Sequence, residues 1–118
     1  MWNSTDGINW TLVTGSAAFG PRVGHTMTVF NNRMWVIGGG SSGTADVWSS
    51  ADGITWTEAT ANAGFAPRFD HQAFVLNNEL CIVAGNAGGV GGIRLNDAWC
   101  SADGANWRLA YNAPIQFP

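Results

Sequence analysis

The chain has 118 residues and a formal net charge of −3, and only five of its residues are Lys or Arg. These five stand singly along the chain, which excludes the basic cluster that neutralises phosphates in nucleic-acid-binding proteins. The longest apolar runs are about five residues, too short for a membrane-spanning helix, and the first twenty residues show no basic segment followed by an apolar leader. We therefore expect neither nucleic acid nor membrane as a partner, and the compartment stays open.

One segment of nine residues occurs three times along the chain. It reads WNSTDGINW at 2–10, WSSADGITW at 48–56 and WCSADGANW at 99–107. A second segment, P-R-x-x-H, occurs at 21–25 and again at 67–71. The spacing is 46 residues from position 2 to 48 and 51 residues from position 48 to 99. A period near fifty residues is typical of propeller blades rather than of helical repeats.

The predicted strands form one incomplete unit and one complete unit in the first half of the chain. Residues 1–21 are expected to hold the third and fourth strands of a unit, followed by a linker. Residues 22–67 form the first complete unit, in which β-branched and apolar residues predict four strands separated by turns at Asn31-Asn32, at the glycine run after Ile37 and at Asp52-Gly53. These strands are expected at 25–30, 33–37, 46–50 and 54–59.

The second complete unit, residues 68–118, repeats the same pattern. Its strands are expected at 72–76, 79–84, 97–102 and 106–111, with a longer glycine-rich loop at 85–96. The stretches 34–37 and 80–84 are apolar at every position, which predicts that both faces of these strands are covered. The predicted fold class is all-β, built from four-stranded antiparallel meanders that stack against one another.

These motifs resemble the kelch repeat. Paired glycines follow an apolar strand at Gly38-Gly39, and Trp48 and Trp56 stand eight residues apart after them, with the Pro-Arg-x-x-His segment opening each unit. The second unit departs from the pattern, because Ala84-Gly85 replaces the paired glycines. The Asp-Gly turns are also similar to the Asp-box of sialidase-type propellers, but they are one residue shorter between Asp and Gly. The resemblance implies about two and a half kelch-like propeller blades.

Two and a half blades leave apolar blade faces bare, since propellers generally need at least four blades to close. We therefore expect either head-to-tail copies of the chain that share one propeller or a piece of a longer propeller. The predicted function is a non-catalytic binding or assembly module. The alternative is a fragment of a propeller enzyme, galactose-oxidase-like or sialidase-like, whose catalytic residues lie in missing blades.

No catalytic residue, metal site or cofactor is predicted in this chain. His25 and His71 occupy equivalent repeat positions, so a structural hydrogen-bonding role is expected for both. Two histidines and the single tyrosine, Tyr111, fall short of a copper redox site, and zinc would need more ligands than two Cys and two His provide. Cys81 and Cys100 lie on strands that can approach, but a bridge demands particular geometry, and two buried free thiols are expected.

The candidate binding residues lie on the face where the long loops and the linkers between blades emerge. Arg22 and Arg68 would stand at the channel rim on this face, where kelch-like domains commonly bind peptides or proteins; a carbohydrate stacked on Trp is a further possibility. The alternative for both arginines is an ion pair with Asp46, Asp70 or Asp97. If they bind a ligand, replacing both with Ala should abolish binding and leave the midpoint of thermal unfolding within a few degrees. Two charges specific to the second unit, Asp70 and Arg94, complete the candidates.

The remaining repeated residues are expected to serve the repeat itself. Aromatic packing between blades is the expected role of the repeated tryptophans, and the glycines and histidines are expected to shape and connect the units. These structural positions are His25, His71, Gly38, Gly39, Gly85, Trp2, Trp10, Trp48, Trp56, Trp99 and Trp107.

Overall fold

The computed structural model describes residues 1–88 and 92–112 and consists of antiparallel strands. No helix occurs among these residues, so none of them forms a helix that could cross a membrane. The predicted all-β fold class is confirmed. The strands are β1 (Trp2–Asn3), β2 (Thr11–Leu12), β3 (Thr26–Phe30), β4 (Arg33–Ile37), β5 (Val47–Ser50), β6 (Thr57–Thr60), β7 (Gln72–Leu76), β8 (Glu79–Val83), β9 (Asn86–Ala87), β10 (Ile93–Arg94), β11 (Asp97–Ser101) and β12 (Arg108–Asn112).

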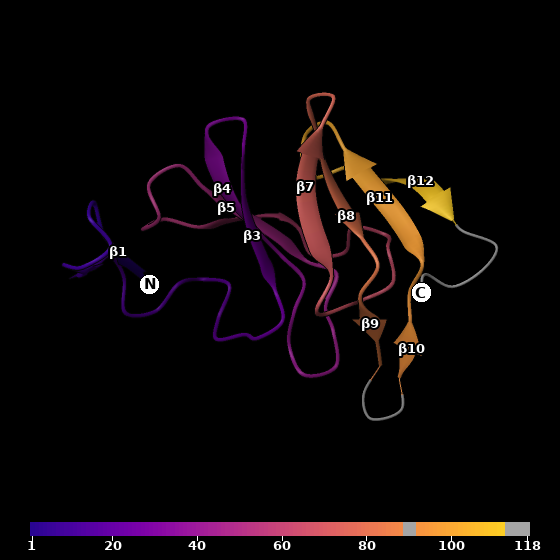
Figure 1. Cartoon of the computed structure of the whole chain (residues 1–118), viewed down its shortest axis with the longest axis horizontal. Coiled ribbons are helices and arrows are strands. Elements are labelled where there is room, and N and C mark those ends of the chain that lie inside the picture. Colours follow the sequence, from indigo (N-terminus) through magenta and orange to yellow (C-terminus); the bar gives the residue numbers. More distant parts are fainter. Residues whose placement is uncertain (89–91, 113–118) are drawn as a thin grey trace.

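Two four-stranded meanders make up most of the molecule. The N-terminal sheet has the order β3-β4-β5-β6, and the C-terminal sheet has the order β7-β8-β11-β12. Each of the two predicted complete units contains one of these sheets. The sheets stand side by side, and the β1-β2 pair lies beyond the N-terminal sheet (Figure 1).

The hairpin turns follow the sequence prediction closely. Asn31 and Asn32 have φ angles of 51° and 57°, the conformation that a two-residue turn between twisted strands requires. Strand β6 begins at Thr57 instead of residue 54, because the carboxylate of Asp52 holds the backbone N–H groups of Ile54 and Thr55 in the preceding turn. The loop at 85–96 contains a short hairpin, β9-β10, which the sequence did not predict.

The apolar core lies between the two four-stranded sheets. Alternate residues of each inner strand point toward the other sheet, so Trp35 and Ile37 of β4 face Leu80 and Ile82 of β8. The intervening residue Val36 is also fully buried, which agrees with the prediction that both faces of these strands are covered.

The two sheets pack closely where the Trp35 ring lies on Gly104. A Cβ atom built on Gly104 would lie 2.1 Å from Cζ3 of Trp35, so only glycine allows the ring to sit there. The indole Nε1 of Trp35 donates a hydrogen bond of 2.8 Å to the Phe30 carbonyl, which fixes the ring in its buried position. A Trp side chain from one sheet therefore fills a space that the Asp-Gly turn of the next sheet leaves open.

The two cysteines form a disulfide within the C-terminal sheet. Cys81 on β8 and Cys100 on β11 are direct cross-strand partners, with a Cα–Cα distance of 4.1 Å. The expectation of two free thiols is wrong, because it treated the register of these strands as unknown. The strand pairing places the two side chains opposite each other on one face of the sheet.

Candidate functional site

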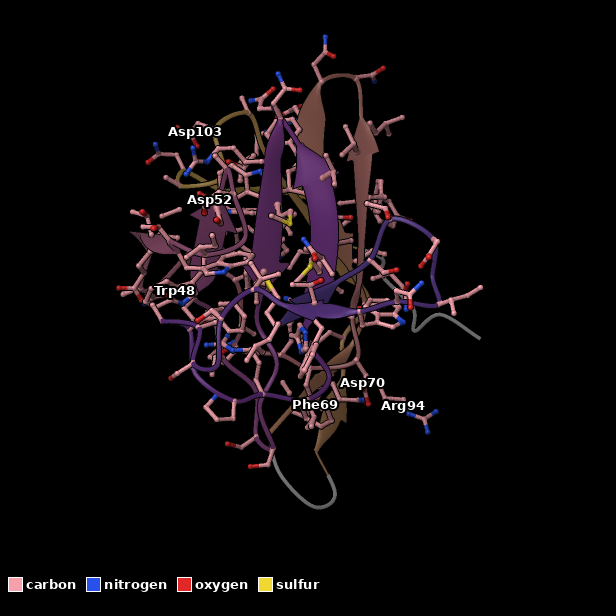
Figure 2. The ribbon with its side chains drawn as sticks, turned by 90° about the vertical axis from the view of Figure 1, so that its left-hand side faces the viewer. Trp48, Asp52, Phe69, Asp70, Arg94 and Asp103 are labelled. Carbon is pink, nitrogen blue, oxygen red and sulfur yellow. A yellow bond between two sulfur atoms is a disulfide. The ribbon has the colours of Figure 1, made fainter. Side chains whose placement is uncertain are left out.

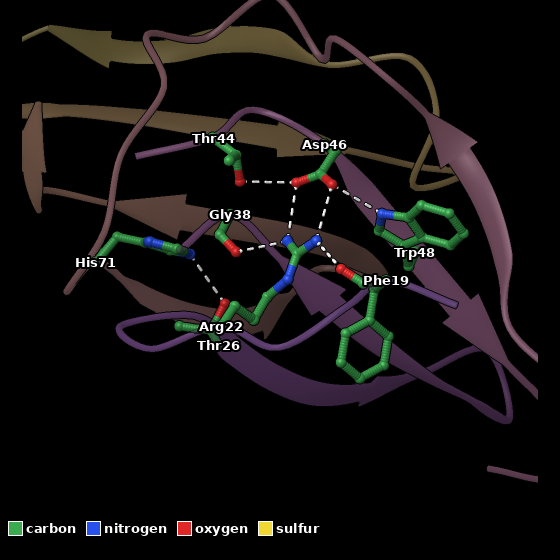
Figure 3. A network of polar contacts seen from close by, with 8 residues as sticks. All are labelled: Phe19, Arg22, Thr26, Gly38, Thr44, Asp46, Trp48 and His71. Carbon is green, nitrogen blue, oxygen red and sulfur yellow. Dashed lines mark hydrogen bonds and ion pairs between the residues drawn. The ribbon is translucent and has the colours of Figure 1, made fainter. Parts of the chain in front are cut away.

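Arg22 forms an ion pair with Asp46 at the start of the N-terminal sheet (Figure 3). Its Nη1 and Nη2 atoms donate to the two carboxylate oxygens of Asp46 at 2.9 and 3.0 Å, and the same groups donate to the carbonyls of Gly38 and Phe19. The indole of Trp48 donates to the same carboxylate at 2.8 Å. The arrangement ties the linker before β3 to the loop before β5.

The second unit repeats this arrangement almost group for group. Arg68 makes a bidentate pair with Asp97 at 2.7 and 3.0 Å, and Nη1 also donates to the Ala84 carbonyl. Trp99 donates to Asp97 at 2.8 Å, as Trp48 does to Asp46. We call each set of Arg, Asp and Trp an arginine tie: Arg22-Asp46-Trp48 in the N-terminal sheet and Arg68-Asp97-Trp99 in the C-terminal sheet.

The arginine ties correspond to the ion-pair alternative for the two candidate arginines. Both pairs form within one unit, and the side chain of Arg68 has no exposed surface, so in this conformation it cannot contact a ligand. The Arg22 side chain is 9% exposed. Burial raises the pKa of Asp46, but hydrogen bonds from Arg22, Trp48 and Thr44 outweigh it and lower the pKa to about 2. The carboxylate therefore stays charged and paired at neutral pH.

A Phe side chain three positions before each arginine supports the tie, and the sequence analysis missed it. The guanidinium carbon of Arg22 lies 5.5 Å from the ring centre of Phe19, and that of Arg68 lies 5.3 Å from Phe65. Phe19 in turn packs edge-on against Trp56, with the two ring centres 4.9 Å apart. The repeated spacing F-x-P-R at 19–22 and 65–68 was the available signal.

His71 connects the two four-stranded sheets. Its Nε2 lies 2.9 Å from the hydroxyl of Thr26 on β3, and the ring is almost completely buried. Burial, with the nearby charge of Arg68, lowers its pKa to about 4, so the ring is neutral at neutral pH. The pKa of His25, the repeat equivalent, is also lowered by burial and by Arg22, but that ring is only half-buried.

Asp70 and Arg94 are exposed and lie near the β9-β10 hairpin. Phe69, which precedes Asp70, bridges to Asn86 on β9, and Asn86 also pairs with Arg94 on β10. Figure 2 shows both side chains toward the end of the molecule opposite to Asp52 and Asp103. Asp70 has a φ of 56°, and its N–H donates to the carbonyl of Gly24 at 2.8 Å. Its backbone therefore helps join the sheets, and its carboxylate lies beside Gly24, where a built Cβ atom would be 2.9 Å from Oδ1 of Asp70.

The Asp-Gly turns use the same hydrogen bonds in all three copies of the nine-residue segment. The hydroxyl of the Ser accepts a hydrogen bond from the Gly N–H, and the Asp carboxylate accepts from the N–H groups of the two residues that follow the Gly. The indole of the Trp that ends the segment donates to the Gly carbonyl. Asp6, Asp52 and Asp103 all have a lowered pKa, led by hydrogen bonds from the backbone. Trp10, Trp56 and Trp107 thus close the turns, whereas Trp48 and Trp99 belong to the arginine ties.

Gly38, directly after β4, permits a close contact with the segment that precedes β7. A Cβ atom built there would lie 2.9 Å from the Arg68 carbonyl oxygen and 2.9 Å from Cε1 of His71. The neighbouring Gly39 donates its N–H to the same carbonyl at 2.9 Å. Gly85, the counterpart of Gly39, makes its close contacts with its own unit.

Two hollows open on the face of the N-terminal sheet that points away from the C-terminal sheet. The larger, of about 440 Å³, lies beside Phe19, Arg22 and His25, and we call it the His25 hollow. The smaller, of about 200 Å³, lies between Asn3, Met34 and Gly53, and we call it the Gly53 hollow. Nδ1 of His25 is buried beside the larger hollow without a hydrogen-bond partner in the described residues.

The described residues contain no group of three or more His, Cys, Asp and Glu side chains that could hold a metal ion. No protein-family model matches the chain, and no curated protein is significantly similar to its sequence. The kelch resemblance consequently rests on the repeat motifs alone.

Proposed function

We propose that this chain is a non-catalytic assembly and binding module, a kelch-like propeller segment that completes a ring with further four-stranded units. Other copies of the chain or the remainder of a longer chain would supply these units. In this proposal the N-terminal and C-terminal sheets are two blades, and the β1-β2 pair is the outer half of a third.

The observation that carries the proposal is the exposure of repeat positions that are buried between the two sheets. Phe30 is 4% exposed, whereas Leu76, at the same position of the C-terminal sheet, is 57% exposed. A second repeat position differs in the same way outside that interface: Trp56 packs on Phe19 and is 6% exposed, whereas Trp10 in the β1-β2 pair is 57% exposed. A third sheet on either side would bury such residues as the existing interface does, at about 25 cal/mol for each Å² removed from water.

Binding of a peptide, protein or carbohydrate on the loop face forms the second half of the proposal. Because the arginine ties engage Arg22 and Arg68, Asp70 and Arg94 are the candidates with exposed charge. A charge-reversal pair, Asp70→Lys with Arg94→Glu, would weaken such binding without touching either tie.

The assembly proposal is tested by the mass of the protein in solution together with its affinity for an apolar fluorescent dye. We expect either masses above the 12.5 kDa of one chain that rise with concentration, or a monomer that binds the dye strongly. A monomer that unfolds cooperatively at every concentration and binds no dye would show that these faces need no cover.

A further inference from the structure

We infer that the open face of the N-terminal sheet takes a β-hairpin that adds to the free edge of β1, places an aromatic side chain in the Gly53 hollow and brings a glycine pair against Arg22. This inference rests on the proposed assembly function and names the partner of that one face. The existing interface between the two four-stranded sheets provides the template.

The Gly53 hollow corresponds to the space beside Gly104 of the C-terminal sheet, which the Trp35 ring of the N-terminal sheet fills. Gly53 and Gly104 occupy the same repeat position, and the Trp35 ring lies directly on Gly104. Around Gly53 the nearest groups are instead the flexible ends of Met34, Met1 and Val13, at 3.2 to 3.8 Å from a Cβ built there. Side chains that can move aside thus stand where the second interface holds a fixed indole.

The free edge of β1 fixes the register of the incoming hairpin. β1 is the counterpart of β5, but among the described strands it pairs with β2 alone, whereas β5 pairs with both β4 and β6. In the N-terminal sheet, Trp35 pairs with Ser49, whose counterpart in β1 is Asn3. A hairpin added to β1 in the same register therefore places its aromatic residue opposite Asn3, which lines the Gly53 hollow.

Backbone groups beside the His25 hollow supply a second part of the template. Between the two sheets, Gly39 N–H donates to Arg68 O, Arg68 N–H donates to Thr44 O, and Asp70 N–H donates to Gly24 O. The equivalent groups of the first unit, Arg22 N–H, Arg22 O and Gly24 N–H, have no partner in the described part of the chain. His25 likewise lacks the threonine that His71 contacts. A segment shaped like residues 24–44, which contains Gly24, Thr26, Gly39 and Thr44, would provide a partner for each of these groups.

The C-terminal sheet of a second copy fits this face poorly. Ala84 takes the place of Gly38, and a Cβ atom at that position would lie 2.9 Å from the partner's carbonyl oxygen in the template geometry. Cys81 takes the place of Trp35, and its side chain is bonded to Cys100. A hairpin of the type found at residues 25–40, with both the aromatic residue and the glycine pair, is the occupant that the face selects.

The experiment completes, within one chain, the incomplete N-terminal unit that contains β1 and β2. Residues 19–46 are joined directly ahead of Met1, because Met1 occupies the repeat position of Val47 and the spacing of the N-terminal sheet is thereby reproduced. We expect the thermal midpoint to rise by roughly 10 °C, the amides of Trp2, Asn3 and Gly24 to gain protection from exchange, and the NMR signals of the His25 ring to shift.

Two matched extensions test whether the face is selective. One carries Trp35→Ala and the other Gly38→Ala, each in the added copy only, and the second reproduces Ala84. Both should lose most of the gain in thermal midpoint and protection. Because an extended chain can misfold, a synthetic peptide of residues 19–46 and its two variants are also titrated into the unmodified protein, with the His25 signals as readout.

Equal gains from all three extensions would overturn the inference while leaving the assembly function standing. Absence of any gain in a folded extended chain, or of any peptide-induced shift of the His25 signals, would also overturn it. The assembly function itself would fall only if the unmodified chain were in addition a stable, dye-free monomer.

Discussion

At the scale of single residues, the arginine ties hold charged groups that are largely buried, and the side chain of Arg68 has no exposed surface. The guanidinium of Arg68 is fully buried, so its hydrogen bonds to Asp97 and to the carbonyls of Ala66 and Ala84 must replace the hydration that it loses. Removal of one partner leaves the other charge buried and unpaired, which costs more than the loss of the contact alone.

We predict that Arg68→Ala lowers the free energy of unfolding by about 3 to 5 kcal/mol. Arg22→Ala should cost less, because Arg22 retains some exposure beside the His25 hollow and water can reach Asp46 when it is removed. Urea unfolding of both variants measures the difference. Two small and equal effects would mean that the ties contribute little to stability.

We also predict that acid lowers the free energy of unfolding through the buried ring of His71. The fold lowers the pKa of His71 from 6.5 to about 4, so the unfolded chain binds this proton more readily than the folded one. The stability contributed by the neutral ring is therefore complete above pH 6.5 and is lost as the pH falls toward 4, by roughly 2 kcal/mol between pH 7 and pH 5.

Urea unfolding at a series of pH values, with His71→Gln as the matched variant, isolates this effect. The variant should lose most of the pH dependence between 7 and 5, and a small part should remain because the pKa of His25 is also lowered. An unchanged profile in the variant would assign the dependence to other groups.

At the scale of the elements, the two four-stranded sheets differ in the links that hold their strands together. Each has its own arginine tie, but only the C-terminal sheet has a covalent link, between Cys81 and Cys100 on adjacent strands. The link joins two residues with a sequence separation of 19, and the chain between them includes the β9-β10 hairpin. Disulfides of this kind persist in oxidising surroundings, where we expect the protein to work.

We predict that replacing both cysteines by Ser lowers the free energy of unfolding by about 3 kcal/mol, the chain-entropy value for a loop of this length. The loss should appear as faster amide exchange in β8 and β11, with β4 and β5 less affected. A thiol reductant added to the unmodified protein should reproduce it. No change on either treatment would show that strand pairing alone holds this sheet.

At the scale of the whole molecule, residues 1–88 and 92–112 form one interior interface and two outward faces built from the same repeat positions. We predict that Met27→Arg, on the outward face of the N-terminal sheet, lowers the mass of any assembly in solution and leaves the unfolding midpoint nearly unchanged. Ile54→Arg is the matched control, since Ile54 is also apolar and exposed but lies on an Asp-Gly turn. A similar loss with both variants would point to general solubility instead of a face.

Much of this architecture could be predicted from the sequence, because periodic patterns report local structure. The repeats at Trp48 and Trp99 predicted two four-stranded meanders, and Asn31-Asn32 predicted the tight turn. The disulfide and the contact of Trp35 with Gly104 could not be predicted, because both depend on strand register and on how sheets stack. The partner of Arg22 stayed one of several acids for the same reason.

Because the disulfide closes a loop inside one sheet, the chain should respond unevenly to mechanical tension. If the molecule were pulled from its two ends, the N-terminal sheet could straighten fully, while the segment between Cys81 and Cys100, which have a sequence separation of 19, would stay closed by the disulfide. The contour length would fall short of the fully extended value by roughly 65 Å. Reduction during pulling should release that length in a single step.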